Sequence, residues 1–166
     1  MDYLATPLSK WGKNGVVLDA NLLLVYIVGL FDLRYLPKIK RAASYDGDDW
    51  RRLANLLKHA RKAIVTPGII TEACNLLDTV NRQNDFRIFA TLQRLSSSLR
   101  EDYITAQTLF GHQLCLRFGH ADASIAHLAG RGHLVITDDL RLKVALEGMR
   151  LPVLNFNYLR SLEWIG

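Results

Sequence analysis

Short runs of β-branched and apolar residues alternate with longer segments of helical periodicity along this chain, and this alternation restricts its fold. The runs at residues 16–18, 63–65, 133–136 and 153–154 are predicted to be strands, and a further short strand is expected near Tyr103. Strands that are separated by helices pair in parallel, and helices cover both faces of the resulting sheet. The sequence therefore predicts an α/β fold with a parallel sheet.

The segments between these strands carry the expected helices. Thr66 and Pro67 mark one helix start, because threonine caps helices and proline is favoured at the first helical position. The expected helices begin at residue 20 and then cover about 50–61, 67–78, 86–95, 105–118, 121–130 and 139–148. A polar stretch at residues 32–49 separates the first two helices. With 166 residues, the chain fits a single domain that spans residues 1–166.

Composition favours a cytoplasmic protein without a membrane partner. The longest apolar run, residues 22–31, is shorter than the roughly 20 residues that span a bilayer. The N-terminal residues lack the apolar core of a signal peptide. Cys74 and Cys115 stand alone, without the spacing of paired metal ligands, which is typical of a reducing compartment.

Four carboxylates share helix faces with apolar residues, at spacings of three, four or seven positions: Asp19, Glu72, Asp122 and Asp139. Helix capping explains three of them individually, because aspartate near a helix start binds free N–H groups and suits the helix dipole. Glu72 does not fit this explanation, because it lies more than a turn after Pro67. An unpaired, buried carboxylate costs several kcal/mol or becomes neutral.

A bound divalent cation would remove this cost. Mg²⁺ prefers oxygen ligands and keeps some of its water, and its open positions serve phosphoryl chemistry. The acids that follow strands fall where ligands bind to parallel sheets, beyond the carboxyl ends of the strands. The sequence therefore predicts one acidic Mg²⁺ site formed by Asp19, Glu72, Asp122 and Asp139, with Asp138 as the alternative to Asp139.

Basic residues concentrate in one part of the chain, which has a net charge of +5. Of the 21 lysines and arginines, nine lie between Arg34 and Lys62. A basic surface attracts polyanions, so nucleic acid is one interpretation, and a solvated helix face is the other.

Four segments of the chain, in order, resemble the motifs of the PIN-domain family of metal-dependent ribonucleases. VVLDANLLL (residues 16–24) resembles the opening strand with the first acid, Asp19, and TPGIITEACNLL (66–77) resembles the second motif with Glu72. ADASIAHLA (121–129) is similar to the third motif with Asp122. LVITDDLRL (134–142) is similar to the fourth, with Asp139 as its acid and Asp138 at its variable position. Together the motifs cover nearly the whole chain.

This resemblance implies a three-layer α/β/α sandwich with a central, mainly parallel sheet. It also implies a Mg²⁺- or Mn²⁺-dependent endoribonuclease that cleaves RNA with metal-activated water. The four motif acids would be catalytic and hold the metal, while Asn21 and Thr137 would orient them as polar neighbours. Many bacterial relatives are toxins of toxin–antitoxin pairs and many are homodimers, so the implied partners are RNA, an antitoxin protein and a second copy of the chain.

The stretch at residues 32–49 departs from the compact toxins of the family by its extra length. We hypothesise that this stretch and the helix after it contact the RNA backbone. The residues assigned to this contact are Arg51, Arg52, Lys58, Arg61 and Lys62. The alternative is a solvated loop and helix.

Two other functions compete with this interpretation. A phosphatase of the haloacid-dehalogenase type also places aspartates after its strands, but its second aspartate is Asn21 here, and Glu72 and Asp122 have no role in it. A non-catalytic PIN-like module that binds RNA or protein has no need of clustered carboxylates, which repel phosphate. A nuclease directed at DNA would use the same metals.

Overall fold

The computed structural model describes residue 10, residues 12–84 and residues 86–161. Its centre is a five-stranded sheet with the order β3-β2-β1-β4-β5, in which all neighbouring strands are parallel. The strands are β1 (Val16–Leu18), β2 (Ala63–Val65), β3 (Leu99–Glu101), β4 (Leu134–Thr137) and β5 (Val153–Asn155). The predicted α/β fold with a parallel sheet is confirmed.

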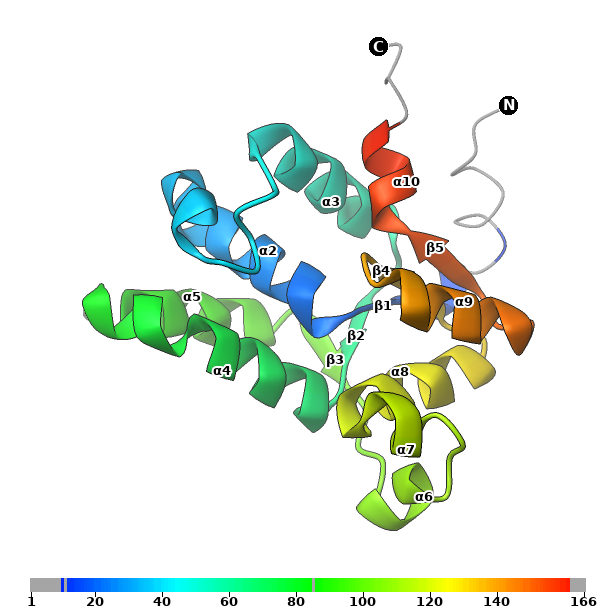
Figure 1. Cartoon of the computed structure of the whole chain (residues 1–166). Helices are drawn as coiled ribbons and strands as arrows, with labels where there is room; N and C mark the ends of the chain where they lie inside the picture. Colours follow the sequence, from blue (N-terminus) through cyan, green and yellow to red (C-terminus); the bar gives the residue numbers. More distant parts are fainter. Residues whose placement is uncertain (1–9, 11, 85, 162–166) are drawn as a thin grey trace.

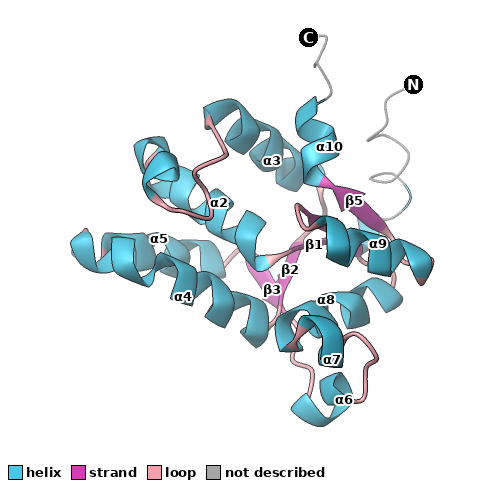
Figure 2. Cartoon of the chain, in the orientation of Figure 1, coloured by secondary structure: helices cyan, strands magenta, loops and turns pink. Residues whose placement is uncertain are grey.

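Helices cover both faces of this sheet (Figures 1 and 2). The first group is α2 (Ala20–Phe31), α3 (Gly47–His59), α4 (Pro67–Gln83) and α5 (Arg87–Ser96). The second group is α6 (Ala106–Phe110), α7 (Cys115–Phe118), α8 (His120–Gly130) and α9 (Leu140–Gly148), and α10 (Phe156–Ser161) follows β5. Two 3₁₀ helices, η1 (Gly12–Asn14) and η2 (Leu33–Lys38), complete the described elements. This arrangement is a three-layer α/β/α sandwich.

The sequence misplaced several element boundaries. The third strand lies at residues 99–101 rather than near Tyr103, and the single helix expected over residues 105–118 is two short helices separated at Gly111. Helix α3 begins three residues earlier than Trp50, because Asp46 and Asp49 form a capping box around its first turn. Helix α4 continues past residue 78 to Gln83. Local propensity defines such ends poorly, because tertiary contacts and caps decide them.

Helix α2 is enclosed on nearly all sides, which explains its apolar sequence. It packs against α3, α4, α5 and η2, and seven of its residues are buried: Ala20, Leu22, Leu23, Leu24, Val25, Ile27 and Val28. Its first turn therefore has a fixed position at the carboxyl end of β1. None of the described helices is long and apolar enough to cross a membrane.

The contact between α2 and α3 depends on a glycine. A Cβ atom on Gly29 would lie 2.0 Å from Cδ1 of Trp50, so only glycine allows this close approach. The Trp50 indole N–H donates to the carbonyl of Tyr26 at 3.1 Å, and the two rings stack with their centroids 6.2 Å apart. This contact holds α3, and the segment that precedes it, against α2.

We expect Gly29→Ala to lower the free energy of unfolding by at least about 2 kcal/mol, because overpacking against a fixed ring displaces Trp50. Urea unfolding followed by circular dichroism measures this change. Gly148→Ala is the matched control, since no atom lies within 4 Å of its added Cβ and alanine is the better helix former. Equal stability of the two variants would show that α3 does not depend on this contact.

Candidate functional site

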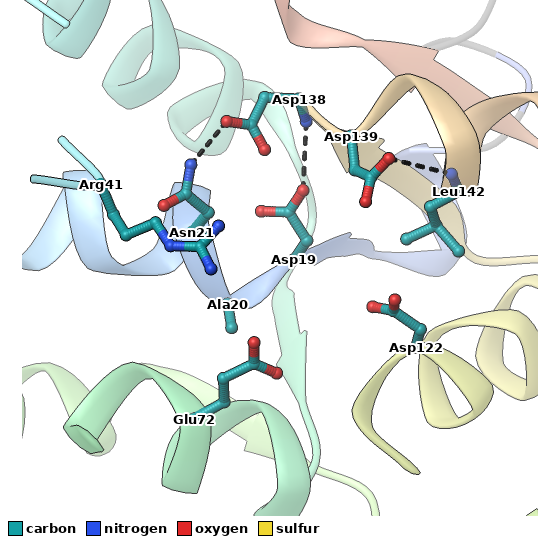
Figure 3. Close-up of a pocket in the computed structure, with 9 residues that line it drawn as sticks. All are labelled: Asp19, Ala20, Asn21, Arg41, Glu72, Asp122, Asp138, Asp139 and Leu142. Carbon is teal, nitrogen blue, oxygen red and sulfur yellow. Dashed lines mark hydrogen bonds between the residues drawn. The ribbon is translucent and has the colours of Figure 1, made fainter. Parts of the chain in front are cut away.

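A pocket lies at the carboxyl edge of the sheet, where β1, β2 and β4 end side by side. It has a volume of about 260 Å³, just below the range of roughly 300–1,000 Å³ that is typical of drug-sized ligands. Its lining consists of Asp19, Ala20, Asn21, Arg41, Glu72, Asp122, Asp138, Asp139 and Leu142 (Figure 3). The structure thus brings all four predicted acids together, with Asp138 as a fifth.

Strand register explains why acids from distant parts of the chain meet here. Val17 of β1 pairs with Ile64 of β2, and Leu18 pairs with Ile136 of β4. Because the strands are parallel and aligned, the residues that follow them emerge at one edge. Asp19 therefore lies beside Asp138, although 119 residues separate them, and α4 and α8 add Glu72 and Asp122.

Asp19 is buried and is held by three donors. Its Oδ1 accepts from the Leu22 amide at 2.7 Å, which makes it the N-cap of α2. Its Oδ2 accepts from the Thr137 hydroxyl and, at 3.1 Å, from the Asp138 amide. Burial and the neighbouring Asp138 charge raise the pKa of Asp19 well above its usual value, against the opposite effect of these hydrogen bonds. A carboxylate has about four acceptor positions, so Asp19 retains capacity for a ligand.

The two predicted polar neighbours both contact pocket acids. Thr137 donates to Asp19 and accepts from the Asp139 amide at 3.0 Å, so it connects two of the acids. The Asn21 amide nitrogen donates to Oδ2 of Asp138 at 2.5 Å. The side-chain oxygen of Asn21, Oδ1, is buried and has no hydrogen-bond partner among the described residues. These contacts orient carboxylates; the metal-related role of both residues stays a prediction.

Asp122 forms a second group with Glu72 and Asp139. Asp122 lies in the first turn of α8, where it accepts no capping hydrogen bond, and Glu72 is exposed on the second turn of α4. Burial first, then the charges of Glu72 and Asp139, raise the pKa of Asp122 from its ordinary value of 3.8 to about 7. Like charges that face one another without compensation disfavour ionisation in this way.

The two adjacent aspartates at the end of β4 have different surroundings. Asp139 caps α9, because its Oδ1 accepts from the amides of Arg141 and Leu142 at 2.7 and 3.2 Å. Asp138 instead accepts from Asn21 and from the hydroxyl of Tyr45. The sequence interpretation treated them as alternatives, whereas both line the pocket.

Sequence reasoning missed two residues of the site, Tyr45 and Arg41. Tyr45 is buried; its hydroxyl donates to Asp138, and burial followed by this contact raises its pKa. Tyr45 and Asp138 are 93 positions apart, so no local pattern connects them. Arg41 lines the pocket from the turn between η2 and α3.

The five residues assigned to RNA lie elsewhere. Arg51 pairs with Asp48, and Arg52 pairs with Asp49 at 3.2 Å, so these two guanidinium groups already have partners. The other three, Lys58, Arg61 and Lys62, are exposed and precede β2, at the edge of the sheet opposite the acids. None of the five lines the pocket, and their contact with RNA stays a prediction.

The donor set suits a hard cation such as Mg²⁺. All five acids offer oxygen ligands, and none forms an ion pair with a described lysine or arginine. Among the described residues, the side-chain oxygen of Asn21 is a further acceptor without a partner. No three of the described His, Cys, Asp and Glu side chains are close enough to ligate one ion as they stand. Magnesium commonly keeps several waters, which bridge it to carboxylates that do not touch it.

No protein-family model matches this sequence, and neither the curated proteins nor the solved structures include a match to it. The family resemblance therefore depends on the four sequence motifs.

The raised pKa of Asp122 makes the metal-free protein less stable at high pH. Between pH 4 and 7 the folded state holds a proton that the unfolded state has lost, so this contribution to stability disappears as the pH rises through about 7. The full difference between the two pKa values of Asp122 corresponds to about 4 kcal/mol of unfolding free energy. We expect about half of this amount, because the carboxyl is partly exposed.

Urea unfolding in EDTA at pH 5 and pH 8 tests this expectation. Asp122→Asn removes the titrating group, so its free energy of unfolding should fall by about 1.3 kcal/mol less than that of the wild type between these pH values, since part of the full difference is already lost at pH 5. Asp78→Asn changes an exposed acid that pairs with Arg82, and it should behave as the wild type. An unchanged pH dependence in Asp122→Asn would contradict a raised pKa of Asp122 in the folded protein.

Proposed function

We propose that this protein is a Mg²⁺- or Mn²⁺-dependent endoribonuclease with a PIN-like fold. The observation that carries the proposal is the set of five carboxylates that line one pocket at the carboxyl edge of a parallel sheet, none of them in an ion pair with a described lysine or arginine. A fold keeps such a repulsive arrangement where function requires it, since uncharged side chains would be more stable there.

Asp19, Glu72, Asp122 and Asp139 would hold the cation directly or through water, and Asp138 is the alternative to Asp139. When bound, the ion supplies activation of water and stabilises charge on the phosphate. The chain itself supplies orientation: Thr137 and the Asp138 amide fix the Asp19 carboxylate before any substrate binds. Fixed ligands reduce the reorganisation that the reaction would otherwise require.

The charge distribution supports a polyanionic substrate. With the five pocket acids set aside, 21 basic residues face 11 of the 16 acidic ones. This excess favours nucleic acid over a small neutral substrate. The choice of RNA, the role as toxin of a toxin–antitoxin pair, the antitoxin partner and the homodimer follow from the family resemblance and belong to the proposal.

The two alternatives account for less of the pocket. A phosphatase of the haloacid-dehalogenase type needs an acid at position 21, where Asn21 instead donates to Asp138. It also assigns no role to Glu72 and Asp122, which line the same pocket. A binding module without catalysis gains nothing from five carboxylates that repel phosphate.

Incubation with single-stranded and structured RNA tests the proposal. We expect cleavage with Mg²⁺ or Mn²⁺ and none with EDTA, and we expect Asp19→Asn to reduce the rate by at least ~10²-fold, because metal ligands belong to the reacting assembly. Asp78→Asn changes a carboxylate outside the pocket and should retain the wild-type rate.

Parallel reactions with DNA and with a generic phosphomonoester distinguish the alternatives. Hydrolysis of the monoester without cleavage of RNA would favour the phosphatase. Equal cleavage of RNA by wild type and Asp19→Asn would reject the acidic pocket as the active site.

A further inference from the structure

Arg41 is the only cation among the nine described residues that line the acidic pocket. Figure 3 shows its guanidinium on the same side of the pocket as Asn21. Its side chain is exposed, and it forms no ion pair with a described carboxylate. A guanidinium in such surroundings remains available to a ligand.

The turn that carries Arg41 is attached to the site itself. Ala42, the next residue, is fully buried, and its amide donates to the Ile39 carbonyl at 2.8 Å. Three residues further on, the Tyr45 amide donates to the Ala42 carbonyl at 2.9 Å, and the Tyr45 hydroxyl donates to Asp138. The backbone on both sides of Arg41 is thereby fixed relative to the pocket acids.

A second anchor comes from the C-terminal helix. Arg160 of α10 donates to the Ser44 carbonyl, and its guanidinium lies 4.6 Å from the centre of the Tyr45 ring. It also pairs with the buried Asp49 at 2.8 Å, at the start of α3. The end of β4, the helix α10 and the start of α3 therefore determine where residues 41–45 lie, so the fold itself sets the position of Arg41.

Three other arginines from this part of the sequence are already paired. Arg34 pairs with Asp32 at 2.7 Å, Arg51 with Asp48, and Arg52 with Asp49. If Arg41 served only to neutralise the acids, an ion pair with one of them would be expected, and none is present among the described residues. The unpaired guanidinium at the pocket instead suits an anion that enters from outside.

We propose that Arg41 binds the non-bridging oxygens of the RNA phosphodiester that enters the pocket. A guanidinium presents a planar fork of donors that matches two phosphate oxygens, and it stays charged beside carboxylates. Donors aimed at a phosphoryl group stabilise the charge that its oxygens carry during transfer. This inference rests on the proposed nuclease function and adds the residue that holds the substrate opposite the acids.

The test compares Arg41→Ala and Arg41→Lys with Lys40→Ala. Lys40 is the matched control, because it is the neighbouring exposed cation and does not line the pocket. Cleavage of a single-stranded RNA oligonucleotide gives kcat/KM, and fluorescence anisotropy in EDTA gives the affinity for the same RNA. Thermal unfolding with and without Mg²⁺ measures whether the metal still binds.

We expect Arg41→Ala to lower kcat/KM by about 30-fold or more, since a charge-assisted contact to the phosphate is lost. It should bind RNA more weakly than Lys40→Ala and keep the stabilisation by Mg²⁺. The kcat/KM of Arg41→Lys should lie between the values of Arg41→Ala and the wild type, because lysine keeps the positive charge without the planar set of guanidinium donors. Lys40→Ala should stay within about threefold of the wild type.

Equal cleavage and equal RNA affinity in Arg41→Ala and Lys40→Ala would overturn the inference. A lower melting temperature of Arg41→Ala that Mg²⁺ restores, together with wild-type cleavage, would also overturn it, because Arg41 would then be only a countercharge. If the wild type does not cleave RNA, the proposed function fails and RNA affinity alone decides the role of Arg41. Weaker binding than Lys40→Ala would then support it, and equal binding would reject it.

Discussion

The carboxylate of Asp19 joins the two strand ends on which the site depends. It accepts hydrogen bonds from Leu22 at the start of α2 and from Thr137 and Asp138 at the end of β4. The same contacts that fix the acid also place it, buried, beside a second aspartate, so its pKa rises. The arrangement is therefore favourable in its hydrogen bonds and unfavourable in its charge. A cation would remove the unfavourable part, since it stabilises the ionised form.

The polar stretch between α2 and α3 is part of the site. It contains η2 and the turn with Arg41, and its last residues contact the acids through Tyr45. Gly29 admits Trp50 against α2, which fixes α3 and hence the end of this stretch. The polar stretch thus contributes Arg41 to the lining of the pocket and a hydrogen bond from Tyr45 to Asp138.

Positive charge is divided between two edges of the sheet. Lys58, Arg61 and Lys62 precede β2, at the edge opposite the acids, because a parallel strand runs from one edge to the other. A strand residue advances about 3.3 Å, so even three residues separate the two edges by roughly 10 Å. Arg41 lies at the edge with the acids. Charge counted along the sequence could not distinguish the two groups.

The sequence by itself determined the parallel α/β fold, four of the five strands and four of the five pocket acids. The strands, Asp19 and Asp139 follow from local rules, because β-branched runs make strands and an acid after a parallel strand lies at its carboxyl end. Glu72 and Asp122 lie on helices and were identified by their positions on apolar helix faces. Asp19 and Asp139 are also ordinary helix caps, so the capping explanation and the site explanation are both valid for them. The boundaries of β3, α6 and α7 were predicted less well, because long-range pairing decides them.

Only the tertiary structure placed both Asp138 and Asp139 in the pocket, gave Tyr45 its contact with Asp138, and set Arg41 apart from the paired arginines. The physical reason is that these contacts join residues far apart in the chain, and neither periodicity nor spacing in the sequence indicates which distant residues come into contact.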